Sequence, residues 1–129
     1  MITMQLHQQY HFRKSEQGLL AWDVFKLVRM SKDFDVIQVP VSDIRELNED
    51  YWFGQGESIL TKDIAGHAKQ IYDADLSYPI ILCPEGRVMD GMHRVCKAFL
   101  LSHDTISAVK FKELHEPDYV GKEPHELPY

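Results

Sequence analysis

The sequence is poor in cysteine and lacks any long apolar run. Its two cysteines, Cys83 and Cys96, are too few for a disulfide framework, so we expect free thiols in a reducing compartment. No apolar stretch approaches the roughly eighteen residues that a membrane helix needs, and Met1 is not followed by a secretory leader. These absences predict a cytoplasmic protein with no membrane-spanning segment.

Basic residues are also scarce relative to acidic ones. Lys and Arg total 14 against 20 Asp and Glu, which gives a formal net charge of -6. Because nucleic-acid surfaces are built from clustered basic side chains, this balance speaks against nucleic acid as a partner. A length of 129 residues and a hydrophobic content of 44% suit a single domain with one core.

Outside the region of greatest chemical interest, the hydrophobic pattern predicts an ordinary succession of elements. They are a polar arm (1–17), a helix (19–30), a strand (35–41), a helix (61–74), a strand (105–114) and an extended proline-rich tail (116–129). Pro40 favours an edge position or the end of its strand. Thr61 is the expected N-cap of the second helix, whose inward residues are Ile64, Ala68, Ile71 and Tyr72.

The stretch 78–97 is the most informative part of the chain. Its pattern predicts a strand over 80–82, a turn at 84–86, a strand over 87–89 and a helix that begins at Asp90 and Gly91. On that helix His93, Arg94 and Lys97 share one stripe near the N-terminal end, where the helix dipole favours anions over cations.

Two interpretations of this helix start are open. Unpaired backbone N–H groups, Gly91 and the basic stripe could together form a phosphate cradle. Alternatively, Asp90 is an ordinary N-cap and the basic residues form a solvated face.

Two further features also allow a functional and a structural interpretation. Tyr51, Trp52 and Phe53 are adjacent in a presumed loop, where they either form a wall for a ring-bearing ligand such as a nucleobase or attach the loop to the core. His67 lies one turn after Ile64 and is either a core or boundary histidine or a functional group.

The segment 88–94, Val-Met-Asp-Gly-Met-His-Arg, with Ala98 downstream, resembles the ParB/sulfiredoxin superfamily. The similarity covers roughly residues 35–114 and implies an α+β domain with a small mixed sheet packed with helices. Residues 1–34 are then an arm and an extra helix packed on that domain, and residues 115–129 are an extended tail.

Two branches of the superfamily are less similar to this chain. Sulfiredoxins carry a nucleophilic cysteine in this loop where the chain has Met92, and a thioether cannot take that role. The chromosome-partition branch binds CTP and continues into a DNA-reading helix-turn-helix domain, for which too few residues follow Leu114.

The ADP-dependent free serine kinases are similar at Asp90, Gly91, His93 and Arg94, with Met92 as the one departure. The resemblance implies that residues 91–94 hold the nucleotide phosphates and that Asp90 takes part in catalysis, and the basic stripe adds Lys97 to the phosphate-binding set. It also implies a glutamate base after the first strand. Glu46 and Glu49 are both candidates for that base.

The resemblance leaves two functions open. One is a phosphotransferase that uses ATP, ADP or CTP to phosphorylate a small hydroxyl-bearing metabolite. Mg²⁺ is then expected because phosphoryl transfer uses it, and no metal-ligand pattern in the sequence indicates it. The other is a non-catalytic nucleotide- or anion-binding module that regulates a protein partner through the aromatic loop and the tail.

Overall fold

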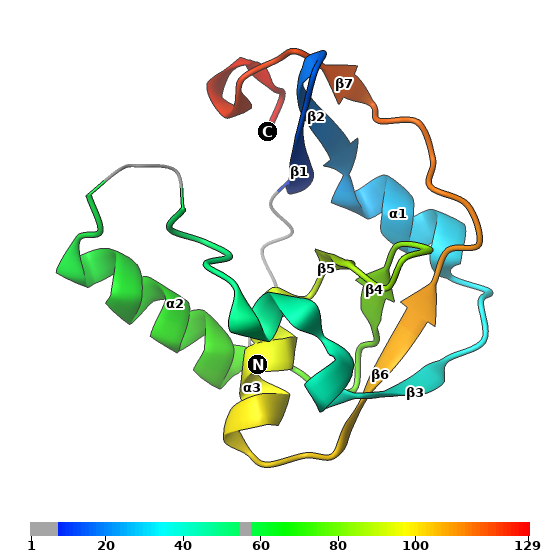
Figure 1. Cartoon of the computed structure of the whole chain (residues 1–129), viewed down its shortest axis with the longest axis vertical. Coiled ribbons are helices and arrows are strands. Elements are labelled where there is room, and N and C mark those ends of the chain that lie inside the picture. Colours follow the sequence, from blue (N-terminus) through cyan, green and yellow to red (C-terminus); the bar gives the residue numbers. More distant parts are fainter. Residues whose placement is uncertain (1–7, 55–57) are drawn as a thin grey trace. The chain divides into compact units, whose positions relative to one another are not determined.

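The computed structural model describes residues 8–54 and 58–129. This part of the chain is α+β, with three α-helices and two small sheets, which confirms the predicted class at that level (Figure 1). The chain divides into two compact units. One unit is Phe34–Glu113, and the other is formed by the two ends of the chain, Met1–Asp33 and Leu114–Tyr129.

The sheet of unit 34–113 has four strands in the order β3-β6-β4-β5. They are β3 (Ile37–Pro40), β6 (Thr105–Lys110), β4 (Ile80–Leu82) and β5 (Val88–Asp90). β4 and β6 are parallel, so the chain must cross over between them, and α3 (Met92–Leu100) lies in that crossover. β3 is an edge strand that ends at Pro40, as the proline predicted.

One apolar cluster joins this sheet to α3. Ile80 and Leu82, alternate residues of β4, enter the cluster, and Val95 and Ala98 enter it from one face of α3. The remaining buried members are Val41, Ile44, Val88, Met92, Ile106 and Ala108. Tyr51 and Trp52 pack against the same cluster, so the aromatic loop is attached to the core.

The helix α2 (Thr61–Asp73) has nearly the predicted bounds but not the predicted packing. Its N-cap is Leu60 rather than Thr61, and the Asp63 carboxylate accepts a hydrogen bond from the Leu60 N–H at 3.0 Å. The expectation that Ile64 and Tyr72 face inward is wrong, because they are 58% and 81% exposed. No residue of α2 is buried, so its apolar periodicity does not mark a core face.

The unit formed by the chain ends is built on a three-stranded sheet. β1 (Tyr10–Ser15) and β2 (Gly18–Asp23) form an antiparallel hairpin, and β7 (Tyr119–Val120) pairs with β2. α1 (Val24–Ser31) follows β2 directly, and the Asp23 carboxylate caps it by accepting from the Phe25 N–H at 2.9 Å.

Two expectations about this unit need correction. The helix predicted over 19–30 is wrong for its first part, and the polar arm contains β1. Residues 19–22 pair along β1, with Ala21 opposite Phe12, and the periodicity of one segment does not reveal a pairing between two. In the tail, β7 and a 3-10 turn, η3 (Pro124–Glu126), add regular structure to the extended segment.

Within residues 8–54 and 58–129, none of the helices has the length and apolar character needed to cross a bilayer.

Candidate ligand pocket and the start of helix α3

Gly91 fixes the geometry at the start of α3. Its φ of 106° lies in the left-handed region, and an added Cβ would lie 2.7 Å from Ile80 Cγ2 and 2.9 Å from Arg94 Nη2. Gly91 itself is the N-cap, so the alternative in which Asp90 caps the helix is wrong. Among the described residues no side chain caps α3, which leaves its first N–H groups to solvent or a ligand.

The guanidinium of Arg94 binds groups of the protein itself. Its guanidinium pairs with the Asp90 carboxylate at 2.8 Å and donates to the carbonyls of Tyr78 and Pro79 at 3.0 and 2.8 Å. These contacts join the start of α3 to the segment before β4, so Arg94 has a structural role whatever else it does.

Lys97 is similarly occupied. Its ammonium donates to the carbonyls of Tyr72 and Ala74, both at 2.7 Å. These carbonyls lie at the C-terminal end of α2, where a cation complements the helix dipole. The cationic groups of Arg94 and Lys97 therefore both already have protein partners.

Glu46 and Glu49, the predicted candidates for the base, lie in different environments. Glu46 is 3% exposed, and one of its carboxylate oxygens accepts from the Val88 N–H at 2.6 Å. Its other oxygen, Oε1, is buried and has no hydrogen-bond partner within the described residues. Glu49 lies nearer the surface and forms a two-pronged ion pair with Arg87 at 2.6 and 2.8 Å, which lowers the pKa of Glu49.

The aromatic loop brings two histidines together with Trp52. The imidazole of His67, on α2, faces that of His93, on α3, with 2.8 Å between His67 Nδ1 and His93 Nε2. Their ring centroids lie 4.2 and 4.6 Å from that of Trp52, with interplanar angles of 24° and 17°. Because the imidazole centroids are only 5.1 Å apart, both rings lie over the same face of the indole.

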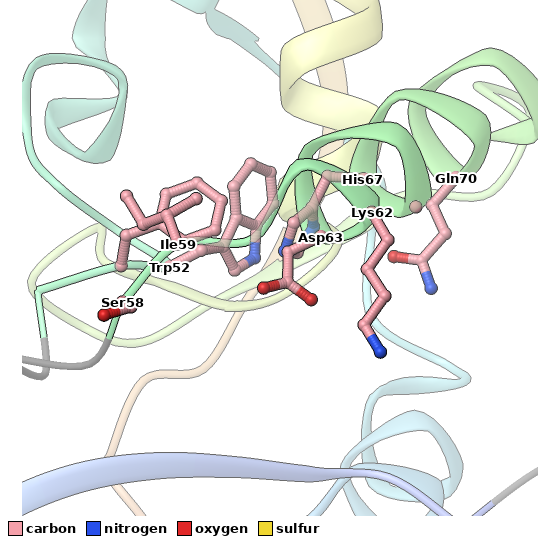
Figure 2. Close-up of a pocket in the computed structure, with 9 residues that line it drawn as sticks. Trp52, Ser58, Ile59, Lys62, Asp63, His67 and Gln70 are labelled. Atoms are coloured by element: carbon pink, nitrogen blue, oxygen red, sulfur yellow. The ribbon is translucent and has the colours of Figure 1, made fainter.

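A pocket of about 410 Å³ lies beside this cluster. It is lined by Trp52, Phe53, Ser58, Ile59, Lys62, Asp63, Gly66, His67 and Gln70. Figure 2 shows Lys62, His67 and Gln70 projecting from α2 on one side of it and Trp52 close to His67. The wall thus combines aromatic surfaces with one cation, one carboxylate and an imidazole.

The two histidines form a hydrogen bond whose direction depends on tautomer. Burial, and then repulsion from His67, lowers the pKa of His93 to about 4, so His93 is neutral near pH 7. A neutral imidazole has one donor and one acceptor nitrogen, so one ring donates to the other. Each ring keeps a second nitrogen for another partner.

The structure brings together residues that the sequence treated separately. The aromatic loop, His67 and the helix start at residues 91–94 were three independent features, and His93 is the residue that joins them. The pairing of His67 with His93 was not predicted. The two residues are 26 positions apart, and no spacing rule connects them.

Within the described ranges no three His, Cys, Asp or Glu side chains are grouped so that they could hold a metal ion.

Comparison of the chain with protein-family models, with curated proteins and with solved structures gave no match. The ParB/sulfiredoxin resemblance therefore stays a prediction.

Proposed function

We propose that this protein binds a nucleotide, or a related small molecule that carries both a ring and a phosphate group. The observation that supports this is the position of His93, which lies in the first turn of α3 and also stacks on Trp52 at 4.6 Å. An aromatic wall and an uncapped helix start are therefore neighbours, as a ligand with a ring and a phosphate requires.

The ring of the ligand would lie in the pocket beside Trp52 and Phe53. Both side chains line this pocket, and stacking of a base on an aromatic side chain contributes roughly 1–3 kcal/mol with little dependence on sequence. Gln70 and Asp63, which also line the pocket, offer hydrogen-bonding groups to the edge of a ring.

The phosphate would be bound chiefly by backbone groups at the start of α3. The N–H groups of Met92, His93 and Arg94 lie in the first turn, where the helix dipole adds to their attraction for an anion. The side chains of Arg94 and Lys97 contribute less than predicted, because carbonyl oxygens already occupy them. Lys62, on the wall of the pocket, is a further cation for a second phosphate group.

Phosphoryl transfer to a small hydroxyl-bearing metabolite is the activity that we propose for this site. Such a reaction depends mainly on positioning and on neutralising phosphate charge, which a helix start and a few cations supply. Asp90, which adjoins Gly91 and pairs with Arg94, would orient the loop and the substrate.

Titration calorimetry with ATP, ADP and CTP tests the binding step, together with NMR of the Trp52 indole N–H and the Met92 and His93 amides. We expect saturable binding that shifts all three signals. Trp52→Leu should weaken binding by about 5- to 150-fold, the equivalent of 1–3 kcal/mol.

Tyr72→Leu is the matched control, because this aromatic residue of α2 is 81% exposed and lies outside the pocket. Its nucleotide affinity should equal that of the unchanged protein. Binding that leaves the Trp52 and His93 signals in place, or no binding at millimolar nucleotide, would show that the proposed function is wrong.

A further inference from the structure

Phosphoryl transfer to a hydroxyl group needs a residue that accepts the hydroxyl proton. The carboxylates expected in this role have other partners. Glu46 accepts from the Val88 N–H, and Glu49 is paired with Arg87. On the wall of the pocket itself lies an imidazole, that of His67.

We propose that His67 is the acid–base residue of this site, which takes the proton of a hydroxyl group on a substrate that shares the pocket with the ring of the nucleotide, with His93 as its positioning residue. This inference rests on the proposed function, because the phosphoryl donor is the bound nucleotide.

The contacts of His67 decide which of its nitrogens could act. Nδ1 faces His93 Nε2 at 2.8 Å, so Nε2 is the nitrogen that remains for a substrate. Of the two histidines, His67 is the one among the described residues that line the pocket. Stacking on Trp52 and the hydrogen bond to His93 together restrict the rotation of the ring, as a catalytic base requires.

The surroundings also suit the positive charge that His67 gains. His93, whose pKa is lowered to about 4, remains a neutral acceptor for the Nδ1–H of His67 near pH 7. The face of Trp52, at 4.2 Å, stabilises an imidazolium by a cation–π interaction. Asp63 and Lys62 are the charged residues that share the pocket wall with His67, and they carry opposite signs.

The proposed step conserves atoms and electrons. The substrate oxygen forms a bond to the terminal phosphorus of the nucleotide, and the bond from that phosphorus to the bridging oxygen breaks. The bridging oxygen keeps the electron pair and leaves with the shortened nucleotide. The hydroxyl proton moves to His67 Nε2, while the Nδ1 proton of His67 stays in its hydrogen bond to His93, and solvent later removes the added proton.

The test measures phosphate transfer from ATP and from ADP to a panel of small alcohols, serine included, by the full chain and by His67→Gln. We expect kcat to fall by about 10²- to 10⁴-fold in His67→Gln, the usual effect of removing a general base, when turnover is measured at saturating nucleotide. His103→Gln, which alters an exposed histidine outside this pocket, is the matched control and should keep full turnover.

The role of His93 has its own readout. His93→Asn should change the acid limb of the pH–rate profile, and long-range ¹H–¹⁵N NMR of the unchanged protein should find the proton between the rings on His67 Nδ1. A proton on His93 Nε2 would overturn the assignment.

Calorimetry distinguishes a wrong assignment of His67 from a wrong proposed function. Nucleotide binding without turnover on any alcohol, or full turnover in His67→Gln, overturns the assignment of His67 and leaves the proposed binding function intact. Absence of nucleotide binding refutes both.

Discussion

The start of α3 and the pocket beside Trp52 differ in how their polar groups are used. At the start of α3, Arg94 and Lys97 donate to backbone carbonyls of neighbouring segments. In the pocket, His67 keeps one ring nitrogen beyond its bond to His93. Basic side chains that suit phosphate binding thus have a structural use in one region, while in the other a histidine that no motif marks has a ring nitrogen outside its hydrogen bond to His93.

The largest effect that would test this comparison is expected at Gly91. Gly91→Ala should lower the free energy of unfolding by about 3 kcal/mol or more, because a strained φ is combined with overlap against Ile80. Gly86→Ala is the matched control, since its φ of 82° is also positive but nothing lies within 4 Å of the added Cβ. It should cost about 1 kcal/mol in urea unfolding, and equal costs at the two positions would show that the contact with Ile80 is unimportant.

Arg94→Ala is expected to have the next largest effect. It removes an ion pair and two bonds to carbonyls at a position that is mostly buried, so the free energy of unfolding should fall by about 2–3 kcal/mol. Lys69→Ala, which breaks an exposed ion pair with Asp73, should cost less than about 0.5 kcal/mol. An Arg94→Ala protein of full stability that has lost nucleotide binding would instead assign Arg94 to the ligand.

The pH dependence of the free energy of unfolding reports on His93, the hydrogen-bond partner of the pocket residue His67. The folded-state pKa of His93 is about 4 against an ordinary value of 6.5, so between these values the unfolded chain binds a proton that folded His93 does not. The free energy of unfolding should therefore fall as the pH drops from about 6.5 to about 4, by about 1–2 kcal/mol for this partly exposed group.

His93→Asn should flatten this slope in urea unfolding at a series of pH values, whereas His103→Asn should not. His11, in the unit formed by the chain ends, also has its pKa lowered to about 4 by burial and by Arg13, so part of the slope should persist in His93→Asn. If His93→Asn kept the same slope as the unchanged protein, the expectation of a half-buried, neutral His93 would be contradicted.

The smallest effect is expected at Lys97. Lys97→Met keeps the aliphatic stem but removes two bonds to carbonyls at the end of α2, which should cost about 1 kcal/mol. Nucleotide affinity measured by calorimetry should change only slightly, because the Lys97 ammonium is already bound to two carbonyl oxygens. A clear loss of nucleotide affinity in this variant would show that the Lys97 side chain does bind the phosphates.

Local patterns were sufficient where one segment sets its own structure. The strands at Ile37–Pro40 and Ile80–Leu82 and the helix Thr61–Asp73 have nearly the predicted bounds, because alternation, proline and helical periodicity act within a few residues. The glycine at the start of α3 was also identified from the sequence as a residue of the turn into the helix, and its positive φ was seen only in the structure.

Other expectations failed because they depended on a partner segment. Residues 19–22 carry a helix-like pattern but pair with β1, and the apolar stripe of α2 contains no buried residue. The partners of Arg94 and Lys97 are carbonyl oxygens, which every residue has and which no sequence motif marks.

The sequence by itself determined an α+β chain, the order of most of its elements and the stretch in which α3 begins. Only the tertiary structure decided that Trp52, His67 and His93 form one cluster, with 2.8 Å between the facing imidazole nitrogens. The reason is physical. Periodicity and turn chemistry act between neighbours in sequence, whereas a site is assembled by packing a loop and two helices onto one core.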